Sequence, residues 1–193
     1  MNRVQVSMVV VSLALVGCGS LETAPVTKDT QVEDVTAVLK IENQEMLNAI
    51  NLARSQSRDC NNGLGVVGPS SPLVWNDDLY QSAYEHATDM ANSDTFSHYG
   101  SGTKYDITAS NSGSGRSYFY ERITSNGYGS YSALGENIAG GQSSIEDVMR
   151  AWLSSPGHCS NIMNDDFAEV GVSVVVEEDS TYGIYWVQNF GKK

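Results

Sequence analysis

The residues of this chain best suited to chemistry are two histidines and a glutamate that lie far apart in the sequence. His98 and His158 each follow the expected end of a helix, and Glu136 lies between them beside a glycine, with apolar neighbours. Two imidazoles and one carboxylate are the ligand set of a hydrolytic zinc site with an open coordination position, and they also suit proton transfer. Because 38 (136 − 98) and 22 (158 − 136) positions separate them, spacing alone does not show that they meet.

The third histidine, His86, is expected to have a structural role. It lies between Ala83 and Ala87, on or beside the apolar face of a predicted helix. The chain contains no HExxH, GxSxG, CxxC or Walker sequence, the short signatures of metalloproteases, serine hydrolases, redox proteins and nucleotide-binding proteins. Any site must therefore be assembled from distant residues.

The first 17 residues have the features of an export signal. Arg3 is positive, and the run from Val4 to Val16 is largely apolar but shorter than the roughly 20 residues that a membrane-spanning helix needs. The sequence Leu15-Val16-Gly17-Cys18 resembles a bacterial lipobox, which implies cleavage before Cys18 and its acylation. With Gly19 directly after this cysteine, the sequence resembles lipoproteins that are sorted to an outer membrane. The alternative is an ordinary secretory signal with an incidental cysteine.

Residues 18–40 are predicted to form the acylated cysteine and a flexible tether, because they are polar and show no sustained apolar periodicity. The folded domain is predicted over residues 41–193. The formal net charge is −12, and loss of the leader, whose only charged side chain is Arg3, changes it to −13 (−12 − 1). A surface this acidic repels phosphate backbones, so nucleic acid is excluded as a partner. We expect a location at the cell envelope, with a lipid anchor in the outer membrane.

The three cysteines are consistent with this location. If Cys18 carries lipid, Cys60 and Cys159 remain as a pair that an oxidising compartment allows to join. They are 99 positions apart (159 − 60), and the chain-entropy model assigns about 4.7 kcal/mol to closing a loop of roughly 100 residues. The alternative is two free thiols.

Apolar periodicity predicts a helix over residues 41–57 and a second one that begins at Asp77 or Asp78 as its N-cap. Residues 101–117 are so rich in glycine and serine that a mobile surface loop is expected there. A short helix is predicted to follow, over residues 118–125.

The clearest helix signal is the capping box Ser143-x-x-Glu146, followed by apolar residues at helical spacing and ended by Pro156-Gly157. A hairpin is predicted from the β-branched residues 170–177 and the returning residues 184–190. Helices around a small antiparallel sheet give a layered α+β domain.

Several ordered motifs resemble those of the CAP/SCP superfamily, which includes cysteine-rich secretory proteins, venom allergens, plant pathogenesis-related proteins and many exported bacterial proteins. The resemblance covers roughly residues 43–191. The motifs are Leu52-Ala53-Arg54, Leu73-Val74-Trp75-Asn76, His98-Tyr99-Gly100, Gly135-Glu136-Asn137-Ile138-Ala139, Ala151-Trp152, Ser155-Pro156-Gly157-His158-Cys159-Ser160-Asn161-Ile162-Met163 and Glu169-Val170-Gly171-Val172.

This resemblance implies an α-β-α sandwich with a small central antiparallel sheet. It also implies a surface cleft in which His98, Glu136 and His158 converge. Family members often add a second glutamate before the last histidine, but residues 151–155 of this chain contain no acid, as in the bacterial branch. The pairing of Cys60 with Cys159 also resembles a bacterial subgroup.

Three functions follow as hypotheses. The first is a binding module without catalysis, for which the resemblance implies ligands such as lipids, sterols, cell-wall fragments or a divalent cation such as zinc. The second is a metal-assisted hydrolase, with Glu121 or Glu169 as the missing base. The third is a purely structural role for His98, Glu136 and His158. Tyrosines between the first two motifs either line a ligand groove or fill interfaces; they are Tyr105, Tyr118, Tyr120, Tyr128 and Tyr131.

Overall fold

The computed structural model describes residues 42–193. The predicted leader, the lipid-accepting Cys18 and the tether lie outside the described residues. The first described helix covers residues 42–54, close to the prediction, and buries one face against the rest of the domain. Within residues 42–193, none of the helices combines the length and apolar character that crossing a bilayer requires.

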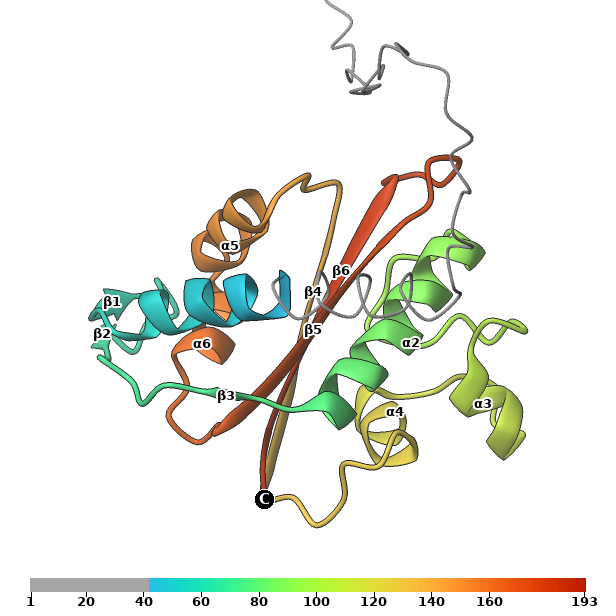
Figure 1. Cartoon of the computed structure of the whole chain (residues 1–193), viewed down its shortest axis with the longest axis horizontal. Coiled ribbons are helices and arrows are strands. Elements are labelled where there is room, and N and C mark those ends of the chain that lie inside the picture. Colours follow the sequence, from blue (N-terminus) through green and yellow to red (C-terminus); the bar gives the residue numbers. More distant parts are fainter. Residues whose placement is uncertain (1–41) are drawn as a thin grey trace, which may run out of the picture.

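Three layers make up the domain, as Figure 1 shows. The middle layer is a sheet in the order β3-β5-β6-β4. One face carries the helix of residues 42–54 with α5 (Ile145–Ser154) and α6 (Pro156–Met163), and the other carries α2 (Asp77–Ser93), α3 (Ile107–Ser112) and α4 (Phe119–Ser125). The strands are β3 (Val74–Trp75), β4 (Ala133–Gly140), β5 (Glu169–Val176) and β6 (Ile184–Lys192), and a separate ribbon joins β1 (Arg58–Asp59) to β2 (Val66–Val67). The expected α-β-α sandwich is confirmed.

The predicted hairpin is confirmed as β5 and β6, which pair in antiparallel register from Glu169 opposite Gly191 to Val176 opposite Ile184. Strand β4 adds an antiparallel partner on the other side of β6, and this register places Glu136 opposite Asn189. The short β3 pairs with β5 in parallel, so the sheet is antiparallel only over its three long strands.

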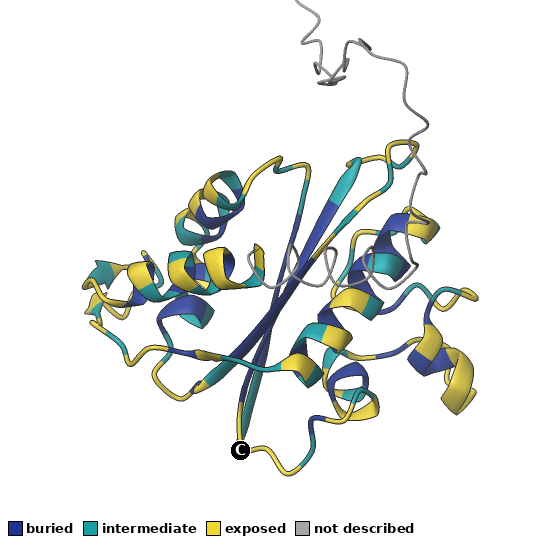
Figure 2. Cartoon of the chain, viewed as in Figure 1, coloured by how far each residue is buried: buried dark blue, intermediate teal, exposed yellow. Residues whose placement is uncertain are grey.

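Both faces of the sheet are covered by apolar side chains, and Figure 2 shows the burial concentrated along the strands and the inward helix faces. Trp152 and Ile162 belong to the cluster that packs α5 and α6 on one face. Ala83, Ala87 and Met90 of α2 pack on the other. At Gly171 a Cβ atom would lie 2.1 Å from the backbone nitrogen of Tyr80, so only glycine lets α2 approach β5 this closely.

Two helix starts differ from the prediction by one residue. The N-cap of α2 is Asn76, whose side chain accepts hydrogen bonds from the backbone nitrogens of Asp78 and Leu79. The N-cap of α5 is Ser144, which accepts from the nitrogen of Asp147. In both cases the predicted residue and the observed N-cap are adjacent and of types that cap helices well. Only the backbone geometry shows which of the two is the cap.

The expectation of a mobile loop over residues 101–117 is wrong. This segment contains α3 and is organised by Asp106, a buried residue whose carboxylate accepts hydrogen bonds from the backbone nitrogens of Gly102, Ala109 and Ser117. Burial alone would raise the pKa of Asp106, but hydrogen bonding by the Ser117 side chain and by these backbone nitrogens outweighs it, and the pKa lies below its ordinary value. One buried carboxylate thus organises this segment, whose glycine- and serine-rich sequence offers few apolar side chains for packing.

Pro156 does not end a helix but begins one. Ser155 is both the last cap of α5 and the first cap of α6, and Pro156 is the first residue of α6. Proline suits this position because its missing N–H would have no partner in the first turn. His158 therefore lies in the first turn of α6, and not in a loop after a helix as the sequence suggested.

Candidate functional site

His98 and Glu136 are in direct contact. The Nδ1–H of His98 donates to Oε1 of Glu136 at 2.9 Å. Glu136 lies in the middle of β4 with its side chain 2 % exposed, whereas the side chain of His98 is 48 % exposed. The buried carboxylate thus fixes the orientation of a histidine ring that is open to solvent on its other side.

Arg122 of α4 completes this group, although no motif in the sequence marks it. Its guanidinium donates to Oε2 of Glu136 at 2.9 Å and to the backbone oxygen of His98 at 3.0 Å. It also donates to the backbone oxygen and the hydroxyl of Ser117. Burial by itself would raise the pKa of Glu136, but the facing His86 and Arg122 and the hydrogen bond from His98 outweigh it and leave the pKa below its ordinary value. Glu136 is therefore an ionised carboxylate with both oxygens occupied.

His86 has the structural role that the sequence predicted. It is fully buried on α2, and its Nε2–H donates to the backbone oxygen of Ser97 at 2.8 Å. Burial lowers the pKa of His86 to about 4, so the ring is neutral near pH 7. Its contact holds the turn that carries His98.

His158 is held over β4 by two asparagines. Asn137 donates to the backbone oxygen of His158 at 3.2 Å, and Asn161 of α6 donates to the backbone oxygen of Glu136 at 3.2 Å and to Oδ1 of Asn137 at 2.8 Å. These bonds join the two motifs that contain Glu136 and His158. They explain why an asparagine follows the glutamate in one motif and another lies three residues after the histidine in the other.

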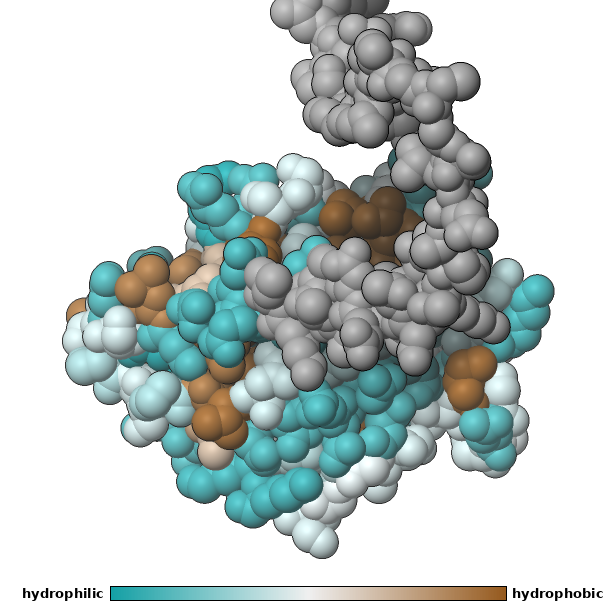
Figure 3. All heavy atoms as spheres, in the orientation of Figure 1, coloured by the Kyte–Doolittle hydropathy of each residue, from teal (hydrophilic) through white to brown (hydrophobic). Residues whose placement is uncertain are grey.

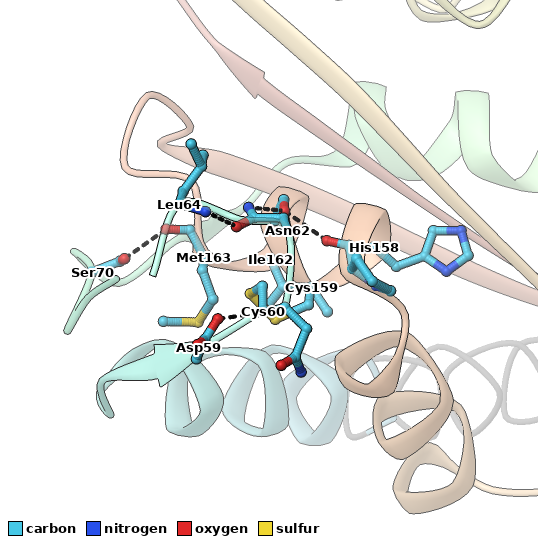
Figure 4. Close-up of a disulfide and its surroundings, with 12 residues drawn as sticks. Asp59, Cys60, Asn62, Leu64, Ser70, His158, Cys159, Ile162 and Met163 are labelled. Atoms are coloured by element: carbon cyan, nitrogen blue, oxygen red, sulfur yellow. Dashed lines mark hydrogen bonds between the residues drawn. A yellow bond between two sulfur atoms is a disulfide. The ribbon is translucent and has the colours of Figure 1, made fainter. Parts of the chain in front are cut away.

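A disulfide also fixes the start of α6. Cys60 and Cys159 are joined, with Cα atoms 5.5 Å apart, which confirms the predicted pairing. Figure 4 shows the His158 ring pointing away from the sulfur atoms. Partial burial lowers the pKa of His158, and the nearby His98 lowers it further. His158 is therefore a neutral imidazole within electrostatic reach of His98.

The three predicted residues do not form a ready three-ligand cage. Both oxygens of Glu136 are bound by His98 and Arg122. Among residues 42–193, no group of three or more His, Cys, Asp or Glu side chains is positioned to hold a metal ion. The arrangement instead places Glu136 as the carboxylate that orients the ring of His98. A carboxylate behind a histidine is a common outer partner in metal sites.

Neither glutamate considered as a catalytic base reaches the histidines through a hydrogen bond. Glu121 accepts from the backbone nitrogen of Tyr118 at the start of α4. Glu169 accepts from the hydroxyl of Tyr128 at 2.5 Å and from the side chain of Asn76 at 2.9 Å. Both carboxylates are thus engaged in holding the fold.

The five tyrosines between the first two motifs differ in burial, and Tyr105 is half-buried. Tyr128 is fully buried and belongs to the core. Tyr118 and Tyr120 stack on each other at 5.5 Å and remain exposed, and Tyr131 is exposed as well. Lys104 lies 4.8 Å from the ring centre of Tyr105.

Comparisons with known proteins identify the family of this chain. The family model "CAP: Cysteine-rich secretory protein family" matches residues 47–190. An uncharacterised protein of Bacillus subtilis, YkwD, is 33 % identical over 122 residues, which are 62 % of this chain and 39 % of that protein. A second one from that organism, the uncharacterised membrane protein YlbC, is 28 % identical over 141 residues, 73 % of this chain and 35 % of its own length. The chain thus matches well under half of each of these relatives.

Solved structures show the same fold. An extracellular protein with an SCP domain from Bacillus anthracis superposes with a TM-score of 0.57 at 24 % identity, over 89 % of this chain and 45 % of that one. An outer surface protein from Borrelia burgdorferi gives a TM-score of 0.50 at 25 % identity, over 65 % of this chain and 80 % of that one. With its sandwich fold, its disulfide and the family model matching most of its length, this chain belongs to the cysteine-rich secretory protein (CAP) family.

Proposed function

We propose that this CAP domain is an exported, lipid-anchored binding module that holds a ligand or a divalent cation between His98 and His158. The observation that carries the proposal is the exposed His98 ring, which the buried Glu136 orients, on the same strand whose Asn137 binds the backbone of His158. The proposal favours binding over catalysis because Glu136, the carboxylate nearest the histidines, is already paired with Arg122.

The hydrogen bond of His98 and the lowered pKa of His158 suit a divalent cation. A neutral imidazole offers a lone pair to a metal, and a hydrogen bond at one ring nitrogen decides which nitrogen remains free. The Nδ1–H of His98 is used by Glu136, so its Nε2 is the ligand atom. The low pKa of His158 keeps that ring deprotonated near neutral pH. Zinc bound there would supply a positive centre that attracts an anionic or carbonyl-bearing ligand.

Export and anchoring are supported by the sequence. The lipobox-like Leu15-Val16-Gly17-Cys18 precedes the domain, and structures with this fold come from an extracellular protein and an outer surface protein. Metabolic labelling with a radioactive fatty acid is expected to mark the wild-type chain and not Cys18→Ser. Equal labelling of the two would disprove the anchor.

The cleft is tested by titrating the purified protein with Zn²⁺ in a calorimeter. We expect His98→Ala and His158→Ala each to weaken zinc affinity by at least about tenfold, in line with the loss of a ligand or its outer partner. Asp179→Ala is the control, because Asp179 is exposed in the turn between β5 and β6, and it should leave affinity within twofold.

A specific observation also favours the structural alternative. Glu136 and Arg122 join β4, α4 and the turn after α2 through buried bonds, which stabilises the fold whatever the cleft binds. Unchanged zinc binding in both histidine variants would leave only this role for the site.

A further inference from the structure

Three tyrosines form an exposed aromatic row that begins at Tyr99, directly after His98. The rings of Tyr99 and Tyr118 meet edge to face at 5.3 Å, and those of Tyr118 and Tyr120 stack at 5.5 Å. Their exposed fractions are 49 %, 44 % and 41 %. Tyrosine pairs of this kind usually fill a core or an interface, so a row left open to solvent is a candidate binding surface.

The end of this row borders a hollow of about 490 Å³, lined by Tyr99, Ser114, Gly115, Arg116 and Tyr118. One wall is the row itself, and the other is the stretch of chain between α3 and α4. His98, Glu136 and His158 do not line it, so it is separate from the histidine site.

The hollow is formed in advance by close backbone packing. A Cβ atom on Gly102 would lie 2.3 Å from the backbone oxygen of Gly115, and one on Gly100 would lie 2.0 Å from a carboxylate oxygen of Asp106. The nitrogens of Gly102 and Ser117 donate to the same oxygen of Asp106. The two walls are thus fastened to each other, and a ligand does not have to order them.

Arg116 gives the hollow a positive charge in an acidic protein. The net charge of the chain is −12. Within the described residues, the arginines and lysines in ion pairs are Arg54, Arg122, Arg150 and Lys193. Arg116 is exposed and is not among them. Its guanidinium is therefore available to a carboxylate, which it can bind through two parallel hydrogen bonds.

We propose that this pocket binds an acidic glycan, through a sugar ring that carries a carboxylate. The C–H face of the ring packs on Tyr99 and Tyr118, whose π faces carry partial negative charge, and the carboxylate pairs with Arg116. The polar backbone of Gly115 and the hydroxyl of Ser114 face the ring hydroxyls, as the few polar groups of a ligand pocket do. This function goes beyond the binding proposed for the histidine cleft and does not depend on it.

Two sugars that differ only by a carboxylate-bearing group test the proposal. The full-length chain is titrated in a calorimeter with N-acetylglucosaminyl-N-acetylmuramic acid, which carries a lactyl carboxylate, and with neutral N,N′-diacetylchitobiose. We expect the acidic disaccharide to bind at least about tenfold more tightly, because charge-assisted hydrogen bonds are the stronger ones. Arg116→Gln should reduce this preference to within twofold, and Tyr99→Ala and Tyr118→Ala should each weaken binding about two- to tenfold.

Tyr84→Ala is the matched control. Tyr84 is 49 % exposed on α2, like Tyr99, and stacks on Tyr80. Its neighbourhood is acidic: burial raises the pKa of Tyr80, and the nearby Tyr84, Glu42 and Asp77 raise it further. This variant should change affinity by less than twofold. Equal binding of the two sugars, equal loss in Tyr84→Ala, or full competition by acetate alone would overturn the proposal. Retained sugar binding in His98→Ala and His158→Ala separates this site from the cleft.

Discussion

Replacing Arg122 by methionine is expected to destabilise the protein by about 3–5 kcal/mol, because it leaves the buried carboxylate of Glu136 without its cation. The side chains of Arg122 and Glu136 are 1 % and 2 % exposed, so water cannot replace the lost partner. The guanidinium also bonds to the backbone of His98 and Ser117, and those acceptors lose their donor as well. Urea unfolding at pH 7, followed by circular dichroism, measures the difference.

Arg150→Met is the control for this prediction. Arg150 pairs with Glu146 and Asp147 on α5 but is 65 % exposed, and exposed pairs contribute about 0–1 kcal/mol. The double variant Arg122→Met with Glu136→Leu should recover much of the loss, because it removes both buried charges together. A loss below 1 kcal/mol in Arg122→Met, or no recovery in the double variant, would show that Glu136 is not held as an ion in the folded protein.

The central role of Arg122 was not visible in the sequence. In the predicted helix of residues 118–125 it is a single cation beside Glu121, a pattern typical of an exposed helix face. Its burial depends on α4 packing against β4 and α2, which is a tertiary property. The residues it supports were found, because His98, Glu136 and His158 lie in ordered motifs that resemble one family. Their hydrogen bonds and the free ring nitrogen of His98 required the structure.

The segment of residues 101–117 shows where composition misleads. Glycine and serine ordinarily predict mobility because they bury little apolar surface. Here Gly100 and Gly102 are needed for close packing, and the carboxylate of Asp106 binds the backbone at three points. The composition of this segment predicts flexibility, whereas its hydrogen bonds to the buried Asp106 hold it in one conformation. These hydrogen bonds form the tyrosine pocket before a ligand binds.

The buried apolar faces of the domain, by contrast, were predicted from the sequence. The apolar stripe of α2 was predicted and faces the core, and the predicted hairpin is buried along half of β5 and most of β6. Figure 3 shows a mostly hydrophilic face with an apolar patch over the far end of the β5–β6 hairpin, where Val174 and Val176 are exposed. Strand β4 escaped prediction because its glycines and polar residues break the alternation.

Removing the disulfide with Cys60→Ala and Cys159→Ala is expected to cost about 2–5 kcal/mol of stability, as in other exported domains. The disulfide joins two cysteines that are 99 positions apart in the sequence. Most of the lost stability comes from the larger number of conformations that the unfolded chain can adopt without this bond. Both sulfurs are buried in the core, so the alanines also leave small cavities. The midpoint of urea unfolding measures the loss, and Cys18→Ser, which keeps the bond, is the control.

The position of His158 should survive this change. Without the disulfide, α6 is still joined to β4 through Asn137 and Asn161. Buried Arg54 still binds the backbone oxygens of Ile162 and Asn164 at its other end. We therefore expect the double variant to unfold at a lower urea concentration, because losing the disulfide raises the conformational entropy of the unfolded chain. Its zinc affinity should stay within about threefold of wild type, because the folded state keeps these hydrogen bonds. Unchanged stability together with lost zinc binding would contradict this prediction. It would show that the disulfide positions His158 rather than stabilising the fold.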